Sequence, residues 1–176
     1  RECDLIIAPS EYVLRKVKSD LKDAKVRMLP TGYDFSEVEK SKGLIRKKFA
    51  VSDRTKIMLY AGRMTKEKNL DFLVSCMKRI VKKYPDSLCF LIGDGGMKEK
   101  LIRKVGEKNM AHKILFLEGM DKKELHKYYR DSDLFLFSSK TETQGLVILE
   151  AMAHNLPVVA VRGPAVTEYI KDKKTG

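Results

Sequence analysis

The sequence contains only three cysteines and three histidines, and neither set has the spacing of a known metal site. Because Cys3, Cys76 and Cys89 are odd in number, reduced cytosolic thiols are expected in place of a disulfide framework. No apolar run approaches the ~20 residues that a transmembrane helix needs. The first residues also lack the pattern of a signal peptide. These absences predict a globular cytoplasmic protein without a metal ion or other cofactor.

The charge of the chain is strongly one-sided. Lys and Arg number 36 against 24 Asp and Glu, which gives a net charge of +12. This excess favours an anionic partner: a nucleotide, a nucleic acid or an acidic membrane surface. A nucleic-acid partner is not expected, because no stretch interleaves aromatic with basic residues as a stacking platform does. Solvated helix faces or a thermophilic source would also account for many of the lysines, so charge alone does not identify the partner.

The two ends of the chain suggest a piece of a longer protein. It begins at Arg1, without an initiator methionine, and ends at Gly176 directly after Lys-Lys-Thr. A break is expected near Pro30-Thr31-Gly32, where turn residues precede a charged stretch that continues to Lys48. We therefore predict that residues 1–32 belong to an earlier unit or its linker, and that residues 33–176 form a second domain truncated at its C-terminal end.

Seven short apolar runs alternate with helical patterns along the chain. They are rich in Ile, Leu, Val and Phe with little alternation, as buried parallel strands are. Strand-helix-strand repetition predicts an α/β fold with a mostly parallel sheet and right-handed crossovers. The predicted strands are Leu5–Ala8, Val26–Leu29, Ile57–Ala61, Leu88–Ile92, Ile114–Leu117, Leu134–Phe137 and Val158–Val161.

Helical patterns lie between these strands. Lys98–Asn109 and Lys122–Arg130 have the pattern of two surface helices. A further helix is expected to begin near Gly145 and to end at Asn155 in a left-handed conformation, because Pro157 follows shortly after. The apolar residues of another helix fall on one face, and they are Leu70, Leu73, Met77, Ile80 and Tyr84.

Several conspicuous residues follow predicted strands, where ligands of parallel α/β sheets bind. Arg63 and Lys68 bracket a loop after one strand, and both would reach a diphosphate from it. Ordinary surface cations are the alternative, because roughly one residue in five of this chain is basic. Gly93-Asp94-Gly95-Gly96 follows the next strand but lacks the full G-x-G-x-x-G pattern, so a dinucleotide fingerprint is not supported. A tight turn without a ligand accounts for it equally.

The helix that begins near Gly145 predicts an anion site. Thr143, Gln144, Gly145 and Leu146 would present unpaired backbone N–H groups at the positive end of the helix dipole. Glycine at position 145 lets a ligand approach the backbone closely, and phosphate is a typical occupant of such a site. An ordinary capped helix remains the alternative.

Two glutamates flank the start of this helix. Glu150 lies in an otherwise apolar run, which indicates a buried carboxylate that needs a partner. A carboxylate can accept hydrogen bonds from the hydroxyls of a ribose, as an acidic residue does in many nucleotide sites. Glu142, in the loop before the helix, is placed to face a sugar beyond a diphosphate.

These residues match a family pattern. The segment E-T-Q-G-L-V-I-L-E-A-M-A-H-N-L-P-V-V-A resembles the E-x7-E motif of family 4 retaining glycosyltransferases, which have the GT-B fold. Y-A-G-R-M-T-K-E-K-N-L is similar to the Arg/Lys phosphate segment of that family, and F-L-I-G-D-G-G to its glycine turn. The resemblance covers nearly the whole chain. It implies the C-terminal half of a GT-B fold: a Rossmann-like parallel sheet with helices on both faces that binds a nucleotide sugar.

The resemblance also implies roles for the candidate residues. Arg63 and Lys68 would hold the diphosphate, and Glu150 would bind the ribose hydroxyls. Glu142, with the backbone of residues 143–146, would contact the donor sugar and the phosphates. Such enzymes transfer a hexose without a metal and with retention at the anomeric carbon.

Four further donor-site residues are implied only by the resemblance. Gly93 and Gly95 belong to the glycine turn, and the loop at Gly119 and Met120 would lie near the base. The resemblance also places residues 1–32 at the end of the N-terminal acceptor domain.

The T-E-T-Q-G and P-T-G segments look most like those of bacterial diacylglycerol glucosyltransferases. They depart from the Gly-Phe-Gly or Ser-Phe-Gly of many members, and Asn155 stands where many have Gly. This resemblance favours UDP-glucose as donor, although GDP- and ADP-sugars remain open from the sequence. We also expect a lipid or glycan acceptor, and peripheral contact of the full-length protein with the inner face of an anionic membrane.

Two other function classes remain open from the sequence. A non-catalytic nucleotide-binding module is possible on the same fold, since fold does not fix function, and a nucleic-acid-binding domain ranks below it. We expect the isolated chain to bind donor nucleotide at best moderately and to catalyse nothing, because the N-terminal share of the catalytic cleft is missing.

Overall fold

The computed structural model describes residues 3–34, 42–107, 109–172 and 174. All seven predicted strands are present, each within one residue of its expected ends. The elements follow the order β1 (Ile6–Ala8), α1 (Glu11–Asp20), β2 (Val26–Met28), α2 (Leu44–Lys48), β3 (Lys56–Ala61), the 3-10 helix η2 (Lys66–Lys68), α3 (Leu70–Lys83), β4 (Ser87–Ile92), α4 (Lys98–Glu107), β5 (Ile114–Leu117), α5 (Lys122–Asp131), β6 (Leu134–Phe137), α6 (Leu146–Ala153), β7 (Val158–Ala160) and α7 (Pro164–Tyr169).

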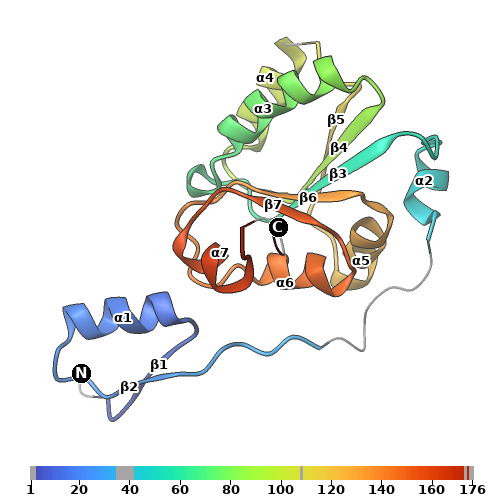
Figure 1. The fold of residues 1–176 in the computed structure, drawn as a ribbon. Coiled ribbons are helices and arrows are strands. Elements are labelled where there is room, and N and C mark those ends of the chain that lie inside the picture. Colours follow the sequence, from blue (N-terminus) through green and yellow to red (C-terminus); the bar gives the residue numbers. More distant parts are fainter. Residues whose placement is uncertain (1–2, 35–41, 108, 173, 175–176) are drawn as a thin grey trace.

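Five strands form one parallel sheet in the order β5-β4-β3-β6-β7. Helices α3 and α4 cover one face, and α2, α5, α6 and α7 lie on the other (Figure 1). This arrangement confirms the predicted α/β fold with a parallel sheet between two layers of helices. The apolar runs were readable in the sequence because strands covered on both faces have no polar side.

The alternation of β3 divides the core in two. Ile57 and Leu59 point toward the layer of α5 and α6, whereas Met58 and Tyr60 point toward α3 and α4. All four side chains are nearly inaccessible to solvent. Successive side chains of a strand face opposite sides, so a single strand anchors both helix layers.

The strand order reverses between β3 and β6. From β3 the chain adds β4 and then β5 on one side, and it then returns through α5 to place β6 on the other side of β3. In open parallel sheets, ligands bind outside the carboxyl ends of the two strands where the order reverses. The fold therefore directs attention to the loops after β3 and β6.

Two expectations about helices had different outcomes. Asn155 follows α6 with φ +54°, the left-handed conformation that was expected. Tyr84 was predicted on the buried face of its helix, but it is 56% exposed. The reason is that α3 ends at Lys83, so Tyr84 lies beyond the last turn and leaves the helix face.

The first strands and helix form a small unit of their own. β1 and β2 pair in parallel, and α1 lies beside them, apart from the five-stranded sheet (Figure 1). The predicted break at Pro30-Thr31-Gly32 falls in a segment without helix or strand. Most of the charged stretch expected after it, residues 35–41, lies outside the described residues. Assignment of residues 1–32 to an N-terminal domain stays a prediction.

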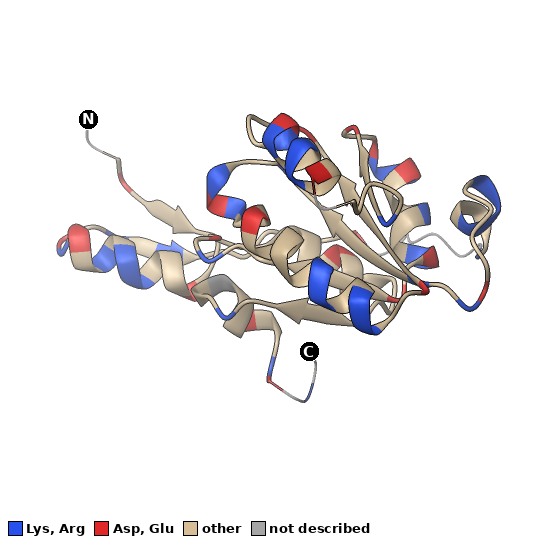
Figure 2. Cartoon of the chain, turned by 90° about the horizontal axis from the view of Figure 1, so that it is seen from above, with Lys and Arg blue, Asp and Glu red and all other residues tan. Residues whose placement is uncertain are grey.

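Two surface properties bear on the partner. Among the described residues, no helix has both the length and the apolar character needed to cross a bilayer. Lysine and arginine are spread over several helices of the molecule (Figure 2). The high net charge is therefore distributed widely over the surface, as the sequence suggested for solvated helix faces.

Candidate functional site

A pocket of about 340 Å³ lies where the strand order reverses. Its walls are the end of β3 with the loop after it (residues 60–63), Lys68 of η2, Phe137 at the end of β6, and residues 142–147. Its volume is within the range of small-molecule sites. Seven of the predicted site residues line it, and they are Arg63, Lys68, Glu142, Thr143, Gln144, Gly145 and Leu146.

The closest charged pair in the pocket joins Lys68 to Glu142. The Lys68 Nζ donates to Glu142 Oε2 at 2.6 Å, and the two side chains are only 13% and 21% exposed. The loop after β6 also fixes the backbone of η2, because the Ser138 hydroxyl donates to the Lys68 carbonyl at 2.6 Å. The Ser139 hydroxyl donates to the Glu67 carbonyl at 3.3 Å. These contacts hold the Lys68 ammonium against Glu142, in the loop that precedes α6.

Arg63 is the second cationic side chain that lines the pocket, and it is exposed. Among the described residues it forms no salt bridge, so its guanidinium is available to an anion. The buried Tyr60 hydroxyl donates to the Arg63 carbonyl at 2.9 Å and fixes the loop at this point. Burial, with the nearby Glu142 carboxylate, raises the pKa of Tyr60 far above its usual value. The hydroxyl therefore stays protonated and remains a donor.

The N-terminus of α6 forms the third wall. Gly145 is its N-cap in the left-handed conformation, with φ +67°, and no side chain caps the helix. The first N–H groups of a helix lack intrahelical acceptors, and the dipole adds partial positive charge there. Two cationic side chains and this helix end thus surround a space that suits a phosphate or diphosphate.

Glu150 differs from its prediction. It was expected to be buried in a helix covered on all sides, but it is partly exposed, and only Ile148 and Ala151 of α6 are fully buried. The reason is that α6 packs on the sheet with one side and leaves the other accessible. The partner that its carboxylate required is Tyr129 of α5, whose hydroxyl donates to Glu150 Oε2 at 2.9 Å.

The glycine turn has a structural explanation. A Cβ on Gly93 would lie 2.1 Å from the Gly62 carbonyl oxygen, and one on Gly95 would lie 2.5 Å from the Met64 carbonyl oxygen. Both glycines have positive φ, +136° and +149°. They let the loop after β4 pack against the loop after β3, backbone on backbone. Neither lines the pocket, so their expected contact with the donor stays a prediction.

The loop at Gly119 and Met120 is also outside the pocket walls. The Gly119 N–H donates to Asp94 Oδ2 at 2.7 Å, and Met120 packs on the core beneath the loop. Lys98 holds the other carboxylate oxygen of Asp94 at 2.6 Å. Asp94 thus joins the loops after β4 and β5 along the same edge of the sheet. Proximity of Gly119 and Met120 to a base stays a prediction.

Sequence reasoning missed the residues that hold the site in place. Ser138 and Ser139 stood directly after a predicted strand, which was the available signal. Tyr60 and Tyr129 gave none, because Tyr60 lies within a predicted strand and Tyr129 within a predicted surface helix. Within the described residues, no group of three or more His, Cys, Asp or Glu side chains gathers where it could hold a metal.

Comparison with known proteins identifies the family. Residues 41–176 match the family described as "Glycosyl transferases group 1". The chain belongs to this family. It is 28% identical over 182 residues to the alpha-monoglucosyldiacylglycerol synthase of Acholeplasma laidlawii, with 100% of this chain and 46% of the relative covered. It is 30% identical to the Streptococcus pneumoniae enzyme of the same name, with 99% of this chain and 41% of that relative covered. The chain thus spans less than half the length of these two relatives.

Solved structures agree with the fold. The Anabaena protein HepE in complex with UDP-glucose has a TM-score of 0.85 at 19% identity, covering 97% of this chain and 48% of that one. The sucrose-phosphate synthase of Thermosynechococcus elongatus has a TM-score of 0.85 at 24% identity, covering 99% and 45%. The fold of this chain therefore matches about half of each of these larger structures.

Proposed function

We propose that this chain is the nucleotide-sugar-binding part of a family 4 retaining glycosyltransferase that moves a hexose without a metal. The observation that carries the proposal is the pocket between β3 and β6, where Arg63, Lys68 and the α6 N-terminus converge on one space. A departing nucleoside diphosphate is the group that such a cationic site stabilises. The neighbouring Glu142 carboxylate contacts the donor sugar.

The other donor-binding roles follow from the positions of the residues along the carboxyl edge of the five-stranded sheet. Glu150, partly exposed on α6, accepts hydrogen bonds from the ribose hydroxyls. The backbone of residues 143–146 binds the phosphates and the sugar. Gly93, Gly95, Gly119 and Met120 belong to the two loops that continue this edge beyond the pocket, on the side of the base.

The donor is UDP-glucose and the acceptor a lipid. The two diacylglycerol-modifying relatives carry the acceptor part of this proposal, and the UDP-glucose complex of the Anabaena neighbour carries the donor part. The distributed positive charge favours peripheral contact of a cytoplasmic enzyme with the anionic inner face of a membrane. Nucleic acid is not a partner in this proposal.

The first unit belongs to an N-terminal acceptor domain. A two-stranded parallel sheet is marginal by itself, and parallel sheets are normally covered on both faces. Here several large apolar residues remain accessible: Leu5 is 44% exposed, Ile7 56%, Leu21 53%, Met28 46% and Leu29 63%. Burial of this surface by further strands and helices would complete the domain.

A non-catalytic nucleotide-binding module is the second candidate, because the pocket alone does not require transfer. The full-length protein distinguishes the two. Glu142→Ala should abolish sugar transfer to diacylglycerol if the protein is an enzyme of this class. Transfer that survives this substitution would contradict the role of Glu142.

The donor is tested by thermal unfolding of the full-length protein with UDP, GDP, ADP and UDP-glucose. A ligand at ~100 times its dissociation constant adds about 2.7 kcal/mol of apparent stability. We expect UDP and UDP-glucose to raise the melting temperature, and Glu150→Ala to reduce the shift. Glu99→Ala, an exposed glutamate on α4, is the control. Stabilisation by GDP or ADP alone would refute the UDP assignment.

A further inference from the structure

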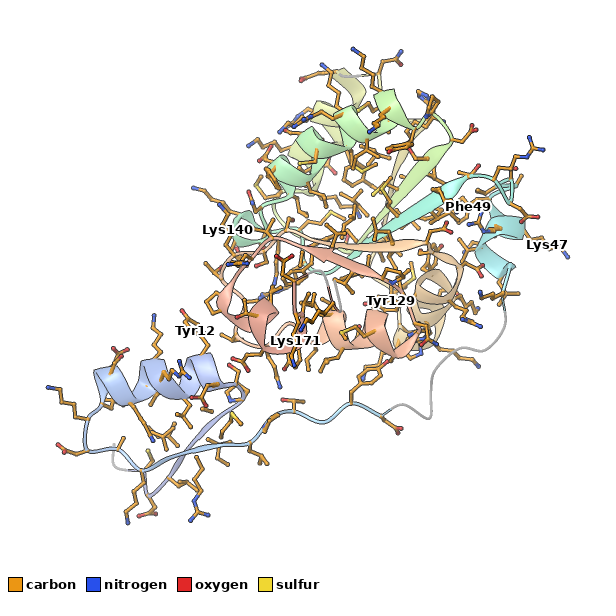
Figure 3. The ribbon with its side chains drawn as sticks, in the orientation of Figure 1. Tyr12, Lys47, Phe49, Tyr129, Lys140 and Lys171 are labelled. Carbon is orange, nitrogen blue, oxygen red and sulfur yellow. The ribbon has the colours of Figure 1, made fainter. Side chains whose placement is uncertain are left out.

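A hydrogen bond between Tyr129 and Glu150 joins two helices, and it connects a buried side chain to a partly exposed one. Tyr129 lies on α5, beside α6 (Figure 3), and none of its surface is accessible to solvent. Its hydroxyl donates to Glu150 Oε2 at 2.9 Å. Glu150 is partly exposed. One end of the pair is thus fixed in the core, and the other reaches the solvent.

The direction of α6 turns the Glu150 end of this pair toward the donor side. Helices α5 and α6 each follow a strand, so each begins at the carboxyl edge of the sheet. Side chains on a helix lean toward its N-terminus, and both side chains therefore lean toward that edge. Glu150 is four residues after Leu146 and shares its face of α6. Leu146 lines the pocket.

The tyrosine ring is held on two sides. It stacks on His154 with a centroid distance of 5.4 Å and an interplanar angle of 23°, and it contacts Phe135 at 5.6 Å. His154 is itself fixed by Nδ1, which lies 2.8 Å from the Glu150 carbonyl oxygen. Burial first, and the Glu150 carboxylate second, raise the pKa of Tyr129 well above its usual value. The hydroxyl is therefore a permanent donor at a fixed point.

A single hydrogen bond from Tyr129 leaves the Glu150 carboxylate able to accept further hydrogen bonds. An ionised carboxylate has two oxygens and about four acceptor positions. Tyr129 occupies one position on Oε2, and no other side chain among the described residues donates to Glu150. A free glutamate side chain would sample several rotamers, whereas this one is restrained before any ligand arrives. Restraint of a binding group in advance lowers the entropic cost of association.

We propose that Tyr129 is a positioning residue for the nucleoside end of the donor: its hydroxyl fixes Glu150 so that the other carboxylate oxygen faces the ribose hydroxyls. This inference rests on the proposed function, in which Glu150 binds the ribose. It assigns a role to a residue of α5 that touches neither the pocket nor the ligand.

The test compares UDP with 2′,3′-dideoxy-UDP as ligands of the full-length protein, by isothermal titration calorimetry. Wild-type protein should prefer UDP, and Glu150→Gln should remove most of this preference. Tyr129→Phe removes only the hydroxyl, and it should reduce the preference about tenfold while dideoxy-UDP binds as before. In the transfer assay, the same variant should raise KM for the donor and leave kcat nearly unchanged.

Tyr128→Phe is the matched control. Tyr128 is the adjacent residue of α5 and is equally buried, but its hydroxyl faces Lys48 of α2. This variant should keep the preference for UDP. A purely structural role of Tyr129 would instead lower the melting temperature and weaken both ligands by the same factor.

The outcomes separate the two levels of the proposal. If wild-type protein binds both nucleotides equally, Glu150 does not bind the ribose, and the proposed function fails at this residue together with the inference. If wild-type protein and Tyr129→Phe show the same preference while Glu150→Gln loses it, the ribose role stands and the positioning role of Tyr129 is refuted.

Discussion

The Lys68–Glu142 pair permits a quantitative prediction for Lys68→Met. The methionine keeps most of the side-chain length but removes the ammonium, so the Glu142 carboxylate loses its partner at 2.6 Å. An exposed ion pair contributes about 0–1 kcal/mol, and breaking a fully buried one costs about 3–5 kcal/mol. With side chains 13% and 21% exposed, this pair falls between the two, and we expect a loss of about 2 kcal/mol. For a chain of this size, that lowers the melting temperature by roughly 4–8 °C.

The same substitution should weaken donor binding. A hydrogen bond to a charged group contributes about 1.5–3 kcal/mol, which corresponds to a ~10- to 150-fold increase in the Kd for UDP. Glu142→Gln in the Lys68→Met background should recover stability, because the unpaired charge is gone, but it should not recover binding. Differential scanning fluorimetry measures the first effect, and isothermal titration calorimetry measures the second.

Two neighbours serve as comparisons. Arg63→Met should weaken UDP binding by a similar factor with little change in melting temperature, because Arg63 is exposed and forms no salt bridge within the described residues. Lys66→Met alters an exposed lysine on the same turn that does not line the pocket, and it should change neither quantity. If Lys68→Met binds UDP as tightly as Lys66→Met does, the assignment of Lys68 to the diphosphate is wrong.

Three further predictions concern the glycine turn, pH and the isolated chain. Gly95→Ala should destabilise the fold by at least about 1–3 kcal/mol, because its Cβ would meet the Met64 backbone, whereas Gly96→Ala, with open space around it, should be nearly neutral in urea unfolding. Burial lowers the pKa of His154 below its ordinary 6.5, so the unfolded chain binds the proton more readily than the folded chain, and stability falls as the pH drops through 6.5. His154→Gln should therefore flatten the decline in melting temperature from pH 7 to 5. His112→Gln, at an exposed histidine, should leave this decline unchanged. The isolated chain should transfer no sugar to diacylglycerol from UDP-glucose, and measurable turnover would contradict the need for a second domain.

Local sequence patterns were sufficient to predict the helices and strands and seven of the residues that line the pocket. β3 and β6 are continuous apolar runs, and the rule that ligands bind at the carboxyl ends of strands pointed to the loops after them. The carboxylate in an apolar helix correctly indicated that Glu150 needs a partner. The partner itself was not predictable, because Tyr129 is 21 residues away and meets Glu150 only after α5 and α6 pack together.

Other features depend on tertiary structure in the same way. The clash that forbids a side chain at Gly93 involves the carbonyl of Gly62, in the loop after β3, and no local pattern encodes it. Tyr84 fitted the apolar face of a helix, but the helix ended one residue earlier. Helix ends depend on capping and on the turn that follows, and periodicity describes neither.

The contact between the first helix and the pocket loop affects how chimeras of these proteins should be designed. The buried Ser10 hydroxyl donates to the Thr143 carbonyl at 2.7 Å, and the Glu168 carboxylate of α7 accepts the backbone N–H groups of Glu11 and Tyr12 at the start of α1. A junction placed at residue 41, where the family match begins, separates these partners. Exchange of donor halves between relatives should therefore carry residues 3–20 along with the pocket loop, so that each loop keeps the helix that evolved against it.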